Sequence, residues 1–263
     1  KIVARLAALG VGYVGVSVDG TEQVHDAFRR RPGAYRASLA AIRRLLVRGV
    51  KVGLRVTLTR HNVACIPALF ELLRAEGVPR ICLYHLVYTG RGAEIAASDL
   101  SAAERRAALD AVVAETRKCF DAGKPVEVLT VDNHCDGPYL YERACAEGPG
   151  FARRSPESML ALLKLNGGNA SGSGIASISW DGTVFPDQFW RNRPVGNVRA
   201  KPFSEIWGDP PPGSLLAQLR ERRPLLPEKC RACKWLSACN GNFRARGEAV
   251  AGDAWGMDPA CYL

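Results

Sequence analysis

The chain has 263 residues, 47% of them apolar, and its 36 basic and 26 acidic side chains give a net charge of +10. No run of about 18 apolar residues occurs, which argues against a membrane-spanning helix. The basic residues form no run of five and no nucleic-acid-binding motif. We therefore expect neither a membrane nor a nucleic acid as partner, and we favour an acidic small molecule.

The nine cysteines are an odd number, and no signal peptide precedes them, which argues against a secreted disulfide framework and favours a cytoplasmic protein. The opening KIVARLAALG has no initiator Met, so we expect a further segment upstream. Scattered cysteines are usually small buried apolar residues. Five cysteines fit that description: Cys65, Cys82, Cys119, Cys135 and Cys145. The other four gather near the C-terminus, which is typical of a metal centre: Cys230, Cys233, Cys239 and Cys261.

Residues 1–131 alternate between helical and strand patterns. Helices are predicted over Lys1–Leu9 and Tyr35–Arg48, and a long helix follows the capping box of Ser101 and Glu104. Four β-rich runs are predicted as strands: Tyr13–Val18, Val50–Leu58, Ile81–Val87 and Val126–Val131. Strands and helices that alternate with short connections predict an α/β fold with parallel strands. Four strands are half of an eight-stranded barrel, or part of a six-stranded barrel whose beginning is missing.

The sequence changes character from about Asp132, where polar and aromatic residues replace the alternating pattern. Ser155 and Pro156 predict the start of a helix over Pro156–Lys164, and a Gly-rich stretch, Asn166–Gly174, follows it. Asp181-Gly182 between β-rich residues predicts a hairpin. We expect a domain boundary near Gly150, which gives a barrel domain over residues 1–150 and a small domain over residues 151–263.

The strongest motif is Cys230-x2-Cys233-x5-Cys239 with Cys261 further on. Soft thiolates bind zinc or iron–sulfur centres. Four of them fit a [4Fe–4S] cluster or a tetrahedral all-thiolate zinc site, and the spacing alone does not separate the two.

This motif resembles the auxiliary-cluster motif of the SPASM and "twitch" domains in radical S-adenosylmethionine (radical-SAM) enzymes. The segments GVSVDGTEQVHDAFR (15–29) and VGLRVTLTRHN (52–62) are similar to the fourth and fifth strands of the barrel in that superfamily. The resemblance implies a partial radical-SAM (β/α)6 barrel, followed by a twitch- or SPASM-like domain with a β-hairpin and an auxiliary iron–sulfur site.

Five further segments narrow the resemblance to the radical-SAM enzymes of haem d1 synthesis (the NirJ-like group) and their relatives in the sirohaem-dependent haem pathway. They are TVDNHCDGPYLY, NGGNASGSGI, DQFWR, GNVRAKPFSEIW and GDAWGMDPACYL. The resemblance implies a 5′-deoxyadenosyl radical and removal of propionates from an iron tetrapyrrole, 12,18-didecarboxysirohaem. A related reaction of the haem pathway is the alternative. It also implies S-adenosylmethionine as cofactor and an electron-donor protein as partner.

Three departures from the family pattern modify this expectation. Asp187 follows Phe185-Pro186 where a ligand Cys is usual, and Phe243 replaces another, so we expect one auxiliary [4Fe–4S] cluster instead of two. Cys135 stands where a small residue is expected. No Cys-x3-Cys-x2-Cys motif occurs, so we expect the SAM-cleaving [4Fe–4S] cluster upstream and no activity from these 263 residues alone.

Several residues receive roles through the resemblance. Ser17, Asp19 and Arg55 would contact S-adenosylmethionine at the strand ends, although Asp19-Gly20 is also typical of a plain turn and Arg55 of a strand arginine. His85 and Tyr88 would line the same pocket, with a structural role as the alternative.

Three more residues are candidates for the substrate. His134, in a polar loop, would bind the substrate iron or move a proton, or it would only organise that loop. Arg191 and Arg193 would pair with substrate carboxylates, or lie solvated on the surface.

A hypothesis from a different class remains: a non-catalytic binding module stabilised by a four-cysteine zinc site. Brown protein with labile sulfide would favour the enzyme, and colourless protein with one zinc would favour the module. The oligomeric state stays open, with edge-strand association of the incomplete barrel as one expectation.

Overall fold

The structure is a computed structural model that describes residues 2–148, 150–151 and 154–263. The chain divides into two compact units, and each is described by itself. Unit 1 comprises Lys1–Leu86, Ile95–Asp132 and Tyr262, and unit 2 comprises Val87–Glu94, Asn133–Cys261 and Leu263. Lys1, where we expected the first helix to begin, lies outside the described residues. Gly150, the expected domain boundary, falls within the range of unit 2.

Unit 1 is built on a sheet of four parallel strands in the order β1-β2-β3-β4. The strands are β1 (Tyr13–Ser17), β2 (Lys51–Leu58), β3 (Arg80–His85) and β4 (Glu127–Val131). These are the four predicted strands, and each end lies within two residues of the predicted one. The α/β fold class with a parallel, barrel-like sheet is therefore confirmed.

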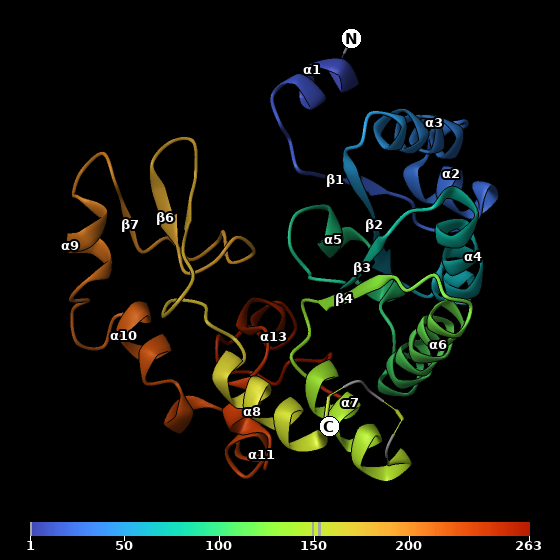
Figure 1. Cartoon of the computed structure of the whole chain (residues 1–263). Helices are drawn as coiled ribbons and strands as arrows, with labels where there is room; N and C mark the ends of the chain where they lie inside the picture. Colours follow the sequence, from blue (N-terminus) through green and yellow to red (C-terminus); the bar gives the residue numbers. More distant parts are fainter. Residues whose placement is uncertain (1, 149, 152–153) are drawn as a thin grey trace. The chain divides into compact units, whose positions relative to one another are not determined.

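The helices of unit 1 lie on one side of this sheet (Figure 1). They are α1 (Ile2–Ala8), α2 (Glu22–Arg29), α3 (Ala34–Val47), α4 (Ile66–Glu76) and α6 (Ala102–Asp121), with short 3₁₀ turns at Val63–Cys65 and Ala96–Ser98. Every second residue of β2 is fully buried, as expected for a strand face that helices cover: Val52, Leu54 and Val56.

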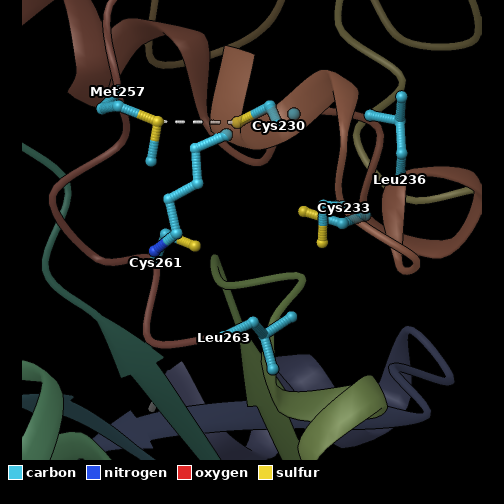
Figure 2. A pocket seen from close by; sticks show the side chains of 9 residues that line it. Cys230, Cys233, Leu236, Met257, Cys261 and Leu263 are labelled. Carbon is cyan, nitrogen blue, oxygen red and sulfur yellow. Dashed lines mark hydrogen bonds between the residues drawn. The ribbon is translucent and has the colours of Figure 1, made fainter. Parts of the chain in front are cut away.

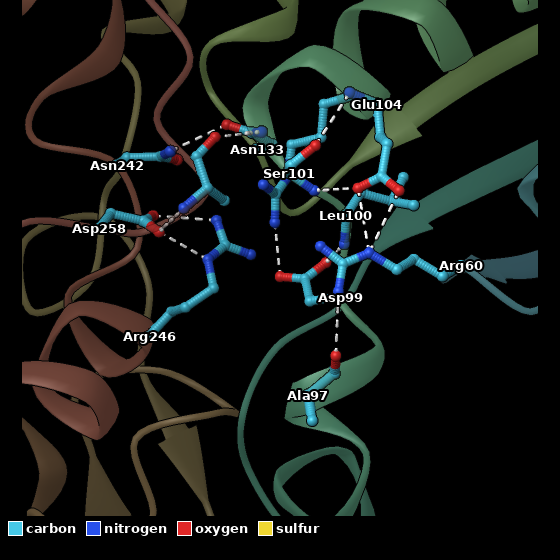
Figure 3. Close-up of polar contacts among 12 residues, drawn as sticks. Arg60, Ala97, Asp99, Leu100, Ser101, Glu104, Asn133, Asn242, Arg246 and Asp258 are labelled. Carbon is cyan, nitrogen blue, oxygen red and sulfur yellow. Dashed lines mark hydrogen bonds and ion pairs between the residues drawn. The ribbon is translucent and has the colours of Figure 1, made fainter.

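The predicted capping box is present at the start of α6. The Ser101 Oγ accepts a hydrogen bond from the Glu104 N–H at 3.3 Å, and the Glu104 carboxylate accepts one from the Ser101 N–H at 2.6 Å (Figure 3). The bond from the Ser101 backbone is the main reason why the pKa of Glu104 falls to about 2. The capping box therefore satisfies two backbone N–H groups at the N-terminal end of α6.

Unit 2 combines short helices with a small antiparallel sheet. The helices are α5 (Arg91–Glu94), α7 (Asp136–Glu147), α8 (Pro156–Asn166), α9 (Phe203–Trp207), α10 (Leu215–Arg220), α11 (Glu228–Arg231), α12 (Leu236–Cys239) and α13 (Arg244–Ala251), with a 3₁₀ turn at Arg223–Leu225. Its sheet has the order β5-β6-β7, from Ser177–Ile178, Thr183–Phe185 and Gly196–Asn197.

The predicted hairpin is confirmed, because β5 and β6 are antiparallel and Asp181-Gly182 lies in the turn between them. The Asp181 Oδ1 accepts a hydrogen bond from the Thr183 N–H at 3.0 Å, which closes the turn. Trp190, Leu219, Ala245 and Ala254 form an apolar cluster in unit 2. Among the described residues, no helix is long and apolar enough to cross a membrane.

Candidate metal centre

Four cysteines from three short segments of unit 2 line one pocket (Figure 2). Cys230 lies in α11, Cys233 in the turn that follows, Cys239 at the end of α12, and Cys261 near the C-terminus. The turn is held by the Cys233 N–H, which donates to the Cys230 carbonyl at 3.1 Å. This turn places the thiols of Cys230 and Cys233 on the same side of the chain, at the pocket.

The remaining walls of the pocket are mostly apolar. Leu236, Met257 and Leu263 line it, and the Met257 sulfur lies 3.6 Å from the Cys230 Sγ (Figure 2). The Trp235 backbone N–H donates to the Cys233 Sγ at 3.4 Å. Backbone donors to cysteine sulfur and exclusion of water are two of the means by which proteins tune iron–sulfur clusters.

Burial raises the pKa of the Cys230 thiol, and the nearby Arg244 guanidinium opposes that rise. The pKa of Cys261 is raised by a hydrogen bond with Cys135 and by burial. Without an occupant, these thiols therefore keep their protons at neutral pH. A metal centre would have to displace the protons, so its binding would strengthen as pH rises.

The four thiols form a ligand set for either of the two centres that the sequence left open. In the described part of the chain, no three His, Cys, Asp or Glu side chains converge closely enough to hold a single metal ion. Four thiolates at one pocket fit a four-iron cluster or a tetrahedral zinc site.

Cys135, which stands where the family pattern has a small residue, is fully buried beside this centre. It shares a hydrogen bond with Cys261, and the Asn242 Nδ2 lies 3.6 Å from its Sγ. Cys135 does not line the pocket. Nothing in the sequence indicates that Cys135 lies next to Cys261, because the two residues are far apart in the chain.

The Gly-rich stretch Asn166–Gly174 packs against the cysteine loop. The Asn169 N–H donates to the Cys239 carbonyl at 3.1 Å, and the Asn240 Nδ2 donates to the Asn169 carbonyl at 2.7 Å. Gly168 has φ +76°, and a Cβ placed there would lie 2.3 Å from the Cys239 carbonyl carbon. The stretch is rich in glycine, and its hydrogen bonds hold it against Cys239 and Asn240.

We expect Gly168→Ala to weaken both the fold and the metal centre. The alanine would combine a strained positive φ, which costs about 1 kcal/mol, with a collision against backbone that cannot rotate away. Gly213→Ala is the matched control, because Gly213 also has φ +76° but no atom within 4 Å of its Cβ position. Thermal unfolding and metal content of both variants check this. Equal losses in the two variants would show that strain alone, and not contact with Cys239, matters.

The two positions that depart from the two-cluster pattern have structural roles here. The Asp187 carboxylate accepts hydrogen bonds from the Ser171 hydroxyl and from the backbone N–H groups of Phe189 and Trp190. Phe243 stacks on His134 at 5.6 Å between ring centroids and meets the Phe189 ring edge-on at 5.7 Å. Neither side chain provides a thiolate ligand for a second auxiliary cluster.

His134 lies in the same polar interior. The backbone N–H of His134 donates to the Asn242 Oδ1 at 3.0 Å. Burial, with a contribution from Arg246, lowers the pKa of His134 to about 4, so the imidazole is neutral at pH 7. A neutral imidazole can act as a ligand or a proton acceptor.

In unit 1, the sheet face opposite the helices brings Ser17 and Arg55 together. These two residues are register partners on β1 and β2, so their side chains share one face. Gly15 leaves space for the Arg55 side chain, since a Cβ there would lie 2.3 Å from the Arg55 Nε. The guanidinium stacks over the Tyr84 ring at 5.7 Å. No carboxylate in the described residues pairs with Arg55, which leaves its N–H donors available to an anionic ligand.

Asp19, His85 and Tyr88, the other three residues expected to contact S-adenosylmethionine, have different surroundings from Ser17 and Arg55. Asp19 is fully buried, and its carboxylate accepts a hydrogen bond from the Arg29 Nε at 2.7 Å, so it organises the turn after β1. His85 pairs in register with Leu58, on the helix-covered face of the sheet, and is buried. Tyr88 belongs to unit 2.

The two candidate substrate arginines have different environments. Arg193 is bound to the Glu248 carboxylate, through its Nε at 2.7 Å, and this hydrogen bond is the main reason why its pKa is raised. Arg191 is exposed, lies over the rings of Trp180 and Phe185 at 5.5 and 5.2 Å, and donates to the Ser179 hydroxyl at 2.6 Å. Both arginines are exposed, and Arg193 is the one of the two that is paired with a carboxylate.

Comparison with known proteins gives the family context of this pocket. The profile of the SPASM family, described as an iron–sulfur cluster-binding domain, matches residues 171–234, which include Cys230 and Cys233. The AdoMet-dependent heme synthase of Methanosarcina barkeri is 30% identical over 99% of this chain and 70% of its own length. The chain belongs to the radical-SAM family with a SPASM domain.

Other radical-SAM relatives are more similar in sequence. The Fe-coproporphyrin III synthase of Methanosarcina barkeri is 50% identical over 100% of this chain, and the pre-heme d1 synthase of Dinoroseobacter shibae is 41% identical over 98%. The chain spans 65% and 63%, respectively, of the lengths of these two relatives.

Solved structures support the fold. Native anSMEcpe with bound AdoMet matches 98% of this chain and 65% of its own, with a TM-score of 0.66 at 15% identity. Streptococcus suis SuiB bound to its precursor peptide matches 95% of this chain and 53% of its own, also at a TM-score of 0.66, with 14% identity. At these identities the likeness establishes the radical-SAM fold and nothing about substrates.

Proposed function

We propose that this chain forms part of a radical-SAM enzyme that remodels carboxylate side chains of an iron tetrapyrrole. The observation that carries the proposal is identity across the whole chain to two tetrapyrrole enzymes, 50% to an Fe-coproporphyrin III synthase and 41% to a pre-heme d1 synthase. The sequence motifs favoured propionate removal in haem d1 synthesis, with the haem pathway as alternative. The higher identity now favours the alternative, formation of Fe-coproporphyrin III.

The proposal gives Cys230, Cys233, Cys239 and Cys261 one auxiliary [4Fe–4S] cluster, which when bound supplies one-electron chemistry. The fit rests on four thiols around one largely apolar pocket and on the match of residues 171–234 to an iron–sulfur cluster-binding domain. Ser17 and Arg55 would hold S-adenosylmethionine, with the Arg55 fork directed at its carboxylate. We leave Asp19 and His85 out of this site, because both are buried in the fold of unit 1.

On the substrate side, the proposal uses the cationic and neutral groups of unit 2. Arg191 would bind a tetrapyrrole carboxylate, because its exposed guanidinium is oriented by two aromatic rings. Arg193 is already paired with Glu248 and would instead support the loop that carries Arg191. His134 would remain neutral beside the substrate and accept a proton or bind the iron.

Product analysis tests the proposal and separates the two relatives. A chain that also carries a Cys-x3-Cys-x2-Cys segment is incubated with 12,18-didecarboxysirohaem, S-adenosylmethionine and dithionite without oxygen. We expect 5′-deoxyadenosine together with Fe-coproporphyrin III, identified by mass. Pre-heme d1 as product would support the other relative, and unchanged tetrapyrrole with no 5′-deoxyadenosine would refute the proposal. The 263 residues alone are expected to make no 5′-deoxyadenosine.

A further inference from the structure

One buried cation of unit 2 lies beside the cysteine pocket and lacks a hydrogen-bonded carboxylate. Arg244, at the start of α13, is 0% exposed. Its guanidinium donates to two backbone carbonyls, of Gly256 at 2.7 Å and of Gly241. Its Nε is buried without any hydrogen-bond partner. Burying a charge in this way is costly unless a counter-charge accompanies it.

Among the described residues, the other buried arginines differ from Arg244. Arg222 also lacks a carboxylate partner, but its Nε, Nη1 and Nη2 donate to the Leu219 carbonyl, the Asn169 Oδ1 and the Ser171 carbonyl. Arg246, two residues along the same helix, forms a two-bond pair with the Asp258 carboxylate at 2.7 and 2.9 Å. Arg105 in unit 1 also has a buried Nε without a partner, but its guanidinium bonds the Asp99 carboxylate at 2.5 Å. Arg244 has no such bond, and Asp258 is already committed to Arg246.

The position of Arg244 points to the pocket. Gly241, whose carbonyl it holds, lines the pocket, and Gly256 precedes the pocket residue Met257. Arg244 thus ties together two segments of the pocket wall. Burial lowers its pKa, and the interactions that oppose this effect are those with Asp258, Cys230 and Cys239, in that order. Two of the four cysteines are therefore within electrostatic reach of its charge.

We propose that Arg244 is the counter-charge and positioning residue of the auxiliary cluster. This inference rests on the proposed cluster. Four thiolates around a four-iron core carry net negative charge, which would offset the buried cation, and the Arg244 Nε–H has no other partner. Because reduction adds one more negative charge to the cluster, a fixed positive charge nearby stabilises the reduced form and raises the reduction potential.

The test is a redox titration of the reconstituted 263-residue chain, followed by electron paramagnetic resonance. We expect Arg244→Gln to shift the midpoint potential of the cluster to more negative values. Arg244→Lys, which keeps the charge, should remain near the unmodified chain but lose iron faster to a chelator. Arg220→Gln is the control for loss of a surface charge, because exposed Arg220 also donates only to backbone carbonyls, of Trp207, Gly208 and Gly172, and none of these residues lines the pocket.

Each outcome decides something. A potential unchanged in Arg244→Gln, or shifted equally in Arg220→Gln, would overturn the inference. An equal negative shift in Arg244→Lys would also overturn it, because the charge would then not be the cause. If Arg244→Gln does not retain a cluster, the Arg244→Lys potential and iron loss decide. Failure of the unmodified chain to assemble any cluster would instead refute the cluster itself, which separates the two claims.

Discussion

Replacing Cys230 by serine is expected to abolish the auxiliary cluster. Serine keeps the size of the side chain but offers a hard oxygen in place of a soft thiolate, and the pocket provides no other Cys beyond Cys233, Cys239 and Cys261. We expect iron and labile sulfide to fall to background after anaerobic reconstitution. The unfolding temperature should fall as well, because a centre that binds only the folded chain stabilises it.

The size of this second effect can be estimated. A tightly bound centre contributes at least about 3 kcal/mol by mass action, which for a chain of this size corresponds to roughly 6–12 °C. Cys145→Ser is the control, because Cys145 is exposed and does not line the pocket. Iron retained at the unmodified level in Cys230→Ser, or lost equally in Cys145→Ser, would contradict the ligand assignment.

Asp258→Asn is expected to cause the largest loss of stability among changes that leave the four cysteines intact. The Asp258 carboxylate is 3% exposed and accepts hydrogen bonds from the Arg246 guanidinium (Figure 3). It also accepts hydrogen bonds from the backbone N–H groups of Phe243 and Ala260. The amide would leave Arg246 buried without its counter-charge. Breaking a buried pair in this way costs about 3–5 kcal/mol, measured by denaturant unfolding.

The pH dependence of this effect has a definite sign. Burial tends to raise the pKa of Asp258, but Arg246 and the hydrogen bonds outweigh burial and hold the pKa below its usual value. A depressed folded pKa contributes stability that is fully present above the unfolded value, about pH 4, and is lost as pH falls through the folded value. The difference between the unmodified chain and Asp258→Asn should therefore shrink below about pH 4.

Glu142→Gln serves as the control for Asp258→Asn. Glu142 pairs with exposed Lys234 at 2.8 Å and accepts a hydrogen bond from the Trp235 Nε1 at 2.9 Å, which glutamine can retain. Such partly exposed pairs contribute about 0–1 kcal/mol. A loss in Asp258→Asn no larger than in Glu142→Gln would show that the buried pair is not a major source of stability.

The parts of the fold that could be predicted are those with local signals. Alternating β-branched residues marked β2, the pair Ser101 and Glu104 marked the start of α6, and Asp181-Gly182 marked the hairpin. Each of these structures forms from neighbours in the chain. The short spacing of Cys230, Cys233 and Cys239 likewise predicted that one pocket would contain them.

The parts that could not be predicted depend on contacts between distant residues. Arginine is normally exposed, so nothing local indicates that Arg244 is buried without a carboxylate. The Gly-rich stretch Asn166–Gly174 is held by a hydrogen bond to Cys239, which is distant in the chain, so nothing in the local sequence indicates it. The helix α7 (Asp136–Glu147) was also missed, because its polar and aromatic residues lack the apolar stripe of an ordinary helix.

The most direct test of the central claim is the metal content of the unmodified chain. Iron, acid-labile sulfide and zinc are measured on one anaerobically reconstituted sample, together with its visible spectrum. We expect brown protein with about four iron and four sulfide per chain, as a single [4Fe–4S] cluster requires. Colourless protein with one zinc per chain and no labile sulfide would contradict it and favour a zinc-stabilised binding module.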